Sequence, residues 1–254
     1  MRIVDMYWLP VSAEIGPRLR TLATEPAPDW AELVKLANTR LDFLQTNRLD
    51  KAIQRSVVTD AGVKTLKLAV LSSSTADHLL PACRVAAARR NFRLQTFVGD
   101  YGMYLQELQD DSAPVHAFAP DVMLFAFHAQ HLFGAGDPTL SQADADAQVE
   151  AVVDRIEHVW SLARRTFRGQ IIQQTIVSPD RPLMGSNEYR LPGSIVTLVE
   201  RVNARLREKA DAHRVDILAL DWMAAGDGTR AWHDPVLWHR AKQEVSPLAR
   251  PRIR

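Results

Sequence analysis

From residue 66 onward, short apolar segments typical of buried strands alternate with longer amphipathic segments typical of helices. The alternation predicts strands at 66–71, 93–98, 121–127, 170–177 and 215–220. It predicts helices at 77–90, 141–167, 194–213 and from 235 to about 245. Because strands separated by helices form parallel sheets covered on both faces, we expect a three-layer α/β/α sandwich around a mostly parallel five-stranded sheet.

The residues before this region follow a helical pattern and contain no convincing strand. Asp29 is a natural N-cap for a helix over 30–38, and a second helix is expected over 47–57, with Leu49, Ile53 and Val57 on one stripe. Two short helices bury too little surface to be stable alone. We therefore expect residues 1–60 to be a helical extension packed on an α/β domain of residues 61–254.

Composition excludes several classes of protein. The formal net charge of +1 gives no global field for nucleic acid or an anionic membrane. Cys83 is the only cysteine, so an internal disulfide and a cysteine-based zinc site are excluded. No run approaches the ~18 apolar residues that a membrane span needs, and the start of the chain lacks the apolar core of a signal peptide. We expect a soluble, cytoplasmic protein with no nucleic-acid or membrane partner.

The sequence lacks the common cofactor motifs. No G-x-G-x-x-G follows the first strand, and neither a phosphate-binding P-loop nor H-E-x-x-H is present, so no cofactor is expected. Asp144 and Asp146 form a D-x-D, but they stand at a polar helix start, where acids favour the positive end of the helix dipole. His128 and His131 lack an evident third ligand, and we expect no metal.

Ligands of parallel α/β sheets bind beyond the carboxyl ends of the strands, so the loops after the strands are the place to search. Ser72, Ser73 and Ser74 follow the first strand. A hydroxyl here can act as a nucleophile beside backbone N–H groups that stabilise an oxyanion, or it can simply cap helix 77–90. Position alone favours capping.

Three further loops favour a catalytic role for the serine loop over simple helix capping. Gly102 follows the second strand, Gln130 follows the third, and His233 precedes the last helix, with His239 inside that helix. A serine, a glycine N–H, an amide and a late histidine are what ester hydrolysis requires: the hydroxyl attacks, the imidazole takes its proton, and the donors stabilise the oxyanion. Asn187, in the loop 178–193, either contributes to substrate binding or fixes that loop through its own side chain.

This arrangement resembles the SGNH (GDSL-type) hydrolase superfamily, whose sheet is flavodoxin-like. The resemblance places Ser74 at the nucleophile, with Ser72 and Ser73 where Gly and Asp are usual. Gly102 then matches the second block, and Gln130 stands where Asn is usual. His233 matches the base, but Arg230 stands three residues before it, where an Asp is usual. Asp234 or Asp227 would then have to orient the imidazole.

A closer resemblance extends over nearly the whole chain. The sequence looks like the N-terminal domain of FkbH-like proteins, which accompany polyketide and related biosynthetic pathways. The matching stretches are Leu36–Phe43, Val70–Pro81, Gly99–Tyr104, Gln173–Thr175, Gly185–Glu188 and Leu237–Pro247. In that family a haloacid-dehalogenase-type domain follows and loads a glyceryl unit from a glycolytic phosphate ester onto a carrier protein. This chain ends at Arg254, before the D-x-D motif of such a domain, so we expect that chemistry in a separate partner.

The residues leave three functions open. The first is a serine esterase or acyltransferase acting on an ester or thioester, free or carrier-bound. The second is a non-catalytic recognition domain that binds a carrier protein or a phosphatase-like glyceryl-transfer partner. The third is formation of a homodimer through the helical extension, with Tyr7, Trp8 and Trp30 as anchors, although aromatic residues pack equally well within one chain.

Overall fold

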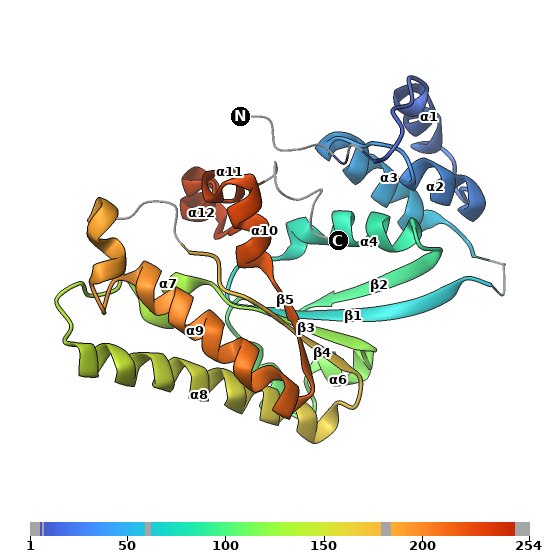
Figure 1. The fold of residues 1–254 in the computed structure, drawn as a ribbon. Helices are drawn as coiled ribbons and strands as arrows, with labels where there is room; N and C mark the ends of the chain where they lie inside the picture. The colour runs from blue at the N-terminus through green and yellow to red at the C-terminus, as the bar shows by residue number, and fades with distance from the viewer. Residues whose placement is uncertain (1–5, 7, 59–61, 179–183, 247–254) are drawn as a thin grey trace. The chain divides into compact units, whose positions relative to one another are not determined.

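The chain forms a five-stranded parallel sheet flanked by helices, which confirms the predicted α/β fold. The structure is a computed structural model that describes residues 6, 8–58, 62–178 and 184–246 (Figure 1). Its strands are β1 (Lys64–Ser72), β2 (Phe92–Val98), β3 (Val122–Ala126), β4 (Gln170–Gln174) and β5 (Val215–Leu218). The strand order is β2-β1-β3-β4-β5, with Ser72 opposite Ala126 in the β1–β3 pair.

The chain divides into two compact units that interleave along the sequence. The first comprises residues 1–67, 76–96 and 245–254, and the second comprises 68–75 and 97–244. The predicted boundary near residue 60 stays a prediction. In the part of the chain that the structure describes, no helix is both long enough and apolar enough to cross a membrane.

The first unit is mainly helical. Its helices are α1 (Ile15–Leu22), α2 (Trp30–Ala37), α3 (Phe43–Arg55), the short 3-10 helix η1 (Asp77–Leu79) and α4 (Leu80–Ala88). Its core includes Leu19, Leu33, Leu49, Ile53 and Val85. These side chains come from four helices, so α4, which follows β1 in the sequence, shares one core with the N-terminal helices.

Capping fixes where the first helices begin. The Asp29 carboxylate accepts a hydrogen bond from the Glu32 N–H at 3.0 Å, as the sequence predicts. Asp42 and Gln45 form a capping box, which starts α3 at residue 43 rather than at the predicted 47. Val57, placed on the helix stripe by the sequence, lies beyond the end of α3 and is exposed, so that part of the prediction is wrong.

The aromatic residues expected to anchor a homodimer differ in how far they are buried. Trp30 is buried, and its indole N–H donates to the Asn91 side chain at 2.8 Å. It therefore packs within its own chain rather than standing free for a partner. Trp8 is about half exposed, and Tyr7 lies outside the described residues.

The second unit carries most of the sheet and the long helices. Its elements are α5 (Tyr104–Gln109), α6 (Pro114–Phe118), α7 (Ala129–Phe133), α8 (Gln142–Thr166), η2 (Gly185–Arg190), α9 (Ile195–Ala210), η3 (Asp211–His213), α10 (Leu220–Asp227), α11 (Thr229–Trp232) and α12 (Pro235–Ala241). Helices α8 and α9 lie side by side below the sheet (Figure 1). Ser141 and Ser194 cap them, within a residue of the predicted starts.

The last helix ends earlier than the sequence suggests. The pattern extends it to about Val245, but α12 stops at Ala241 because Lys242 takes a left-handed backbone conformation with φ of 53°. The Lys242 carbonyl oxygen accepts a hydrogen bond from the Thr75 N–H at 2.9 Å. The end of α12 is thereby joined to the loop that follows β1.

Candidate functional site

The strand order places the candidate site between the exits of β1 and β3. In a 2-1-3-4-5 sheet the connections run in opposite directions from these two neighbouring strands, and ligands of such sheets usually bind beyond the carboxyl ends at this point. A hydrogen bond crosses this point: the His128 N–H donates to the Ser73 hydroxyl oxygen at 2.8 Å. The predicted serine loop and the predicted His128–Gln130 loop therefore meet.

The three serines after β1 differ in what their hydroxyls do. All three are buried. The Ser72 hydroxyl donates to the Ser74 carbonyl oxygen, and the Ser73 hydroxyl accepts from His128. The Ser74 hydroxyl makes no hydrogen bond to any described residue. Ser74 thus keeps the free hydroxyl that its predicted role requires.

These serines do not cap the helix that follows them. The N-cap residues of η1 and α4 are Ala76 and Leu79, and neither cap has a side-chain hydrogen bond. The first turn of this helix is instead a 3-10 turn, followed by Pro81 near the start of α4. A proline lacks an N–H, so one of the groups that a cap would have to satisfy is absent.

Gly102 is close to the serines but already engaged. Its φ of 71° lies in the left-handed region, which favours glycine, as the turn after β2 requires. Its N–H donates to the Ser72 carbonyl oxygen at 3.1 Å. This N–H was expected to stabilise an oxyanion, and in this structure it holds the loop after β2 against the end of β1.

Helix α12 packs directly onto the loop after β3. The indole ring of Trp238 stacks on the His128 imidazole with ring centres 3.9 Å apart and an interplanar angle of 20°. The Trp238 indole N–H donates to the Gln130 side-chain oxygen at 3.1 Å. Because its oxygen faces Trp238, the exposed Gln130 amide has its NH₂ group left to donate, as the sequence prediction requires.

His128 is a neutral imidazole. Its Nδ1 accepts a hydrogen bond from the Gln130 N–H at 3.1 Å, so its proton is on Nε2. Burial lowers the pKa of His128 to about 4, and electrostatic interactions with His233, His131 and Lys242 add to this shift. His233, the predicted base, therefore interacts electrostatically with the same imidazole.

His131 belongs to a different network. Its Nε2 lies 2.9 Å from the Tyr104 hydroxyl and 2.8 Å from Nη2 of Arg155, and the same guanidinium nitrogen donates to Tyr104 at 2.6 Å. Burial, followed by the Arg155 charge, lowers the pKa of His131. The Nε2 atom of His131 is therefore engaged with Tyr104 and Arg155. Among the described residues, no group of three or more His, Cys, Asp or Glu side chains is arranged for a metal.

The acids near the predicted base are used for structure. Asp234 accepts from the N–H groups of Val236 and Leu237 and so caps α12. Among the described residues no hydrogen bond joins Asp234 to His233. Asp227 is buried and accepts from the Trp232 indole N–H at 3.0 Å.

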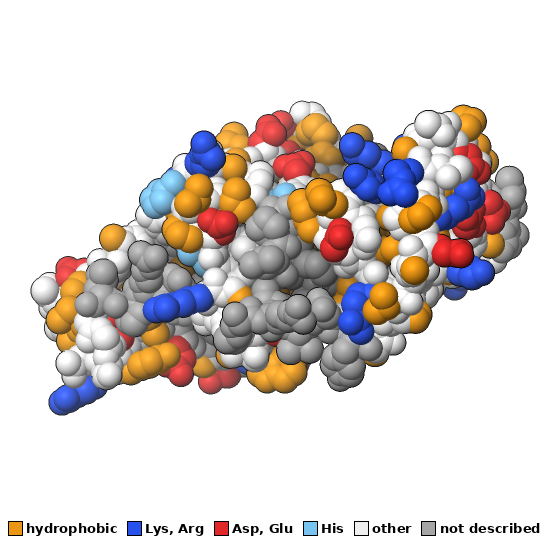
Figure 2. Space-filling model, turned by 90° about the horizontal axis from the view of Figure 1, so that it is seen from above, with side chains coloured by type: hydrophobic (Ala, Val, Ile, Leu, Met, Phe, Trp, Pro, Cys, Tyr) orange, Lys and Arg blue, Asp and Glu red, His pale blue; other side chains and the backbone are white. Residues whose placement is uncertain are grey.

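Two of the predicted site residues lie at the surface. His239 is exposed on α12. Asn187 is exposed within η2, where its backbone N–H donates to the Met184 carbonyl. The structure gives neither a contact with Ser74 or His128. Figure 2 views the surface from the side of α10–α12 and shows histidine and hydrophobic side chains next to one another.

Sequence reasoning missed two buried polar groups. Glu244 is 7% exposed and Gln174, at the end of β4, is 4% exposed. The Glu244 Oε1 and Gln174 Nε2 atoms lie buried without a hydrogen bond of normal geometry to any described residue. Burial raises the pKa of Glu244 to about 8, and the neighbouring Gln174 amide opposes this. A glutamate in a short segment after a helix carries no sequence signal that it is buried.

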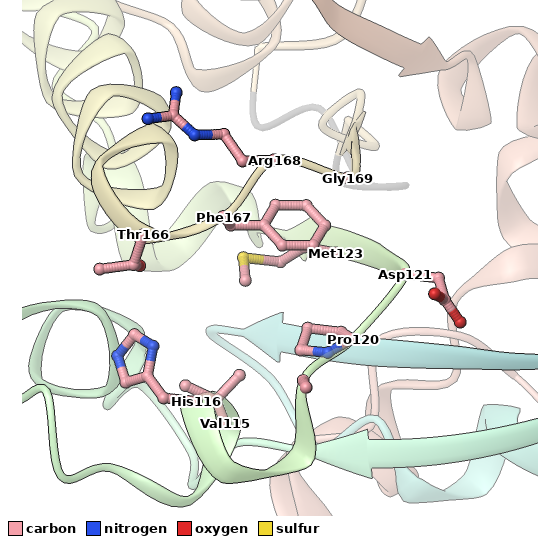
Figure 3. A pocket seen from close by; sticks show the side chains of 10 residues that line it. Val115, His116, Pro120, Asp121, Met123, Thr166, Phe167, Arg168 and Gly169 are labelled. Carbon is pink, nitrogen blue, oxygen red and sulfur yellow. The ribbon is translucent and has the colours of Figure 1, made fainter.

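A pocket of about 400 Å³ lies at the other edge of the sheet. It is lined by residues that precede β3 and β4, including His116, Pro120, Phe167 and Arg168 (Figure 3). These residues stand at the amino ends of the strands, whereas Ser74 and His128 stand at the carboxyl ends. The pocket is therefore separate from the candidate site.

Comparison with known proteins places the chain in a family. The N-terminal part of BF1531 from Bacteroides fragilis, a structure described as containing a phosphatase domain and complexed with Mg, is 18% identical with a TM-score of 0.67. The match covers 83% of this chain and 54% of that one, so this chain spans about half its length. At this identity the likeness shows the fold alone.

Two further structures are similar to a smaller degree. Phospholipase A1 from Streptomyces albidoflavus is 14% identical over 74% of this chain and 94% of its own, with a TM-score of 0.43. A lipase/acylhydrolase from Enterococcus faecalis is 14% identical over 67% and 84%, with a TM-score of 0.39. No curated protein matches the sequence. Residues 67–251, well over half of the chain, match the family described as the N-terminal domain of FkbH, and the chain belongs to that family.

Proposed function

We propose that this domain is a serine-dependent hydrolase or acyltransferase acting on an ester or thioester, with Ser74 as the nucleophile and His233 as the general base. The observation that carries the proposal is the Ser74 hydroxyl. It is buried where β1 and β3 end and has no hydrogen-bond partner among the described residues, whereas its two neighbours are both engaged.

The reaction follows from these positions. The Ser74 oxygen bonds to the acyl carbon as its proton passes to His233, and the carbonyl electron pair moves onto the carbonyl oxygen. When that pair returns, the bond to the alcohol or thiol breaks, and the leaving group takes the proton from His233. Water then releases the acid, or a second nucleophile receives the acyl group. The Gln130 NH₂ is one donor available to the oxyanion.

A fluorophosphonate probe tests the nucleophile without knowledge of the substrate. We expect the probe to phosphorylate Ser74, detected by mass spectrometry of the tryptic peptide. Ser74→Ala should abolish labelling and the hydrolysis of p-nitrophenyl acetate. The matched control is Ser161→Ala, which removes an exposed hydroxyl on α8 and should leave both unchanged. Labelling that persists in Ser74→Ala would remove Ser74 from the reaction.

Two observations favour a second candidate function, recognition without turnover. The Gly102 N–H is bonded to Ser72, and the Asp234 carboxylate caps α12 instead of orienting His233. On this alternative, the surface at the ends of β1 and β3 binds a carrier protein or a phosphatase-like partner. It predicts that no acyl substrate is hydrolysed and that binding of a purified carrier protein, measured by calorimetry, survives Ser74→Ala.

We further propose a place for the domain in a polyketide-type biosynthetic pathway, with an acyl substrate that is free or carrier-bound. Family membership supports the pathway, and the phosphatase domain named for the BF1531 structure supports a haloacid-dehalogenase-type partner. Co-elution with such a protein in size-exclusion chromatography is the expected result. Two separate peaks at micromolar concentrations would contradict the partnership.

A further inference from the structure

His128 makes three separate contacts, two of which orient its imidazole. Its backbone N–H donates to Ser73, its Nδ1 accepts from the Gln130 N–H at 3.1 Å, and its ring lies against Trp238 at 3.9 Å. The contacts come from the β1 loop, from α7 and from α12. A backbone anchored at the β1 loop and a ring fixed by α7 and α12 keep the remaining polar atom in a defined place, which is the structural requirement for a preorganised donor.

That remaining atom is Nε2, and it carries the proton. An imidazole with one proton donates through one nitrogen only, and Nδ1 is already an acceptor. No described residue accepts a hydrogen bond from Nε2, and this nitrogen is not among the buried polar atoms that lack a partner. Among the described residues, the Nε2–H group is therefore left with no acceptor of its own.

The backbone oxyanion donor that the sequence predicts is already engaged, and His128 is placed where another donor could replace it. The Gly102 N–H, the backbone group expected to receive the oxyanion, is bonded to the Ser72 carbonyl. His128 directly follows the β3 exit, is bonded to the serine next to Ser74, and lies near His233. A neutral N–H at this point can donate to a carbonyl oxygen without losing its proton.

We propose that His128 is an oxyanion donor, which uses Nε2–H to bind the carbonyl oxygen of an ester or thioester while Ser74 attacks it. This inference rests on the proposed function. When the Ser74 oxygen bonds to the acyl carbon, the carbonyl electron pair moves onto the oxygen and the Nε2–H···O bond strengthens. The proton of Ser74 goes to His233 and that of His128 stays on Nε2. Trp238 and Gln130 are the positioning residues of this donor.

The test compares the rate at which paraoxon phosphorylates Ser74 in the full chain and in His128→Phe. Phenylalanine keeps a ring against Trp238 and removes the N–H. Removing one oxyanion donor lowers the rate of such reactions about 10²–10³-fold, so we expect a loss of roughly 100-fold. His116→Phe, at the opposite edge of the sheet, is the matched control and should react like the wild type. A His128→Phe rate within about threefold of the wild type would overturn the inference.

A second measurement does not require a variant that folds. In protein with ¹⁵N-labelled histidine, the His128 signals should show the Nε2–H tautomer at pH 7, and the Nε2 proton should move downfield once Ser74 is phosphorylated. The Nδ1–H tautomer, or a proton that does not move, would contradict the inference and leave the nucleophile in place. Failure of paraoxon to label Ser74 at all would instead contradict the proposed function, and the oxyanion role of His128 with it.

Discussion

Glu244 is a carboxyl group whose ionisation changes when the chain unfolds. The folded protein retains its proton up to pH about 8, whereas an unfolded glutamate loses it near 4.5. Between these values the folded state binds more protons, so the free energy of unfolding falls as pH rises. We expect this fall to reach a few kcal/mol, on the order of 1.4 kcal/mol per pH unit. Glu244→Gln keeps the shape and should flatten the profile between pH 4.5 and 8 in urea titrations, and a slope like that of the wild type would show that another group titrates.

His128 affects the pH dependence of the free energy of unfolding below pH 6.5. An unfolded histidine takes up a proton near pH 6.5, and folded His128 does so only near pH 4, chiefly because its ring is buried. The free energy of unfolding should therefore fall as pH decreases from about 6.5 to 4. His128→Phe should reduce this acid destabilisation without removing it, since the pKa of His131 is also lowered by burial. Thermal denaturation at several pH values measures the difference, and identical profiles would argue against a buried neutral His128.

At the scale of elements, the sequence predicted the elements with strong periodicity. The predicted bounds of all five strands and of the long helices α8 and α9 lie within a few residues of the observed bounds. Burial on one or both faces requires apolar residues at regular spacing, and that spacing is visible in the sequence. The short elements α5, α6, α7, α10 and α11 were missed because none of them shows a clear apolar period of its own. Boundaries moved where local chemistry decided them, as at the Asp42 capping box and the left-handed Lys242.

The candidate site was predicted in part for the same reason. Residues that follow strands, such as Ser74 and Gln130, could be placed at one sheet edge from topology. The engagement of Gly102 and Asp234 could not, because it depends on which backbone groups lie within about 3 Å once the loops are packed. Neither could the Trp238–His128 stack, which joins residues that are distant in sequence.

The network that fixes α7 gives a prediction at this scale. Arg155 on α8 is half-buried and donates to both Tyr104 and His131, which it links to the helix beneath the sheet. Arg155→Met leaves both acceptors without their donor and should cost about 1–3 kcal/mol of stability. Arg165→Met changes an exposed arginine of the same helix and should cost less than about 0.5 kcal/mol. Equal effects in urea unfolding would show that the network contributes nothing specific.

At the scale of the whole molecule, the first unit is joined across the sequence by one buried ion pair. The Arg84 guanidinium on α4 meets the Asp50 carboxylate on α3 through two hydrogen bonds, of 2.6 and 2.8 Å, and both side chains are almost wholly buried. Residues of the N-terminal helices and of the segment after β1 thus depend on each other. The pair links α3 to α4, which share one apolar core although β1 separates them in the chain.

Asp50→Ala leaves the Arg84 charge buried without its partner, a change that costs about 3–5 kcal/mol in other proteins. The same loss should not follow in the double variant with Arg84→Met, because no charge is then left unpaired. Hydrogen exchange measured by mass spectrometry shows how far the damage extends. If the two units unfold separately, Asp50→Ala should speed exchange in α1–α4 and leave α8 and α9 protected. Faster exchange in all of these helices would mean that the units unfold together, and that the N-terminal helices stabilise the candidate site.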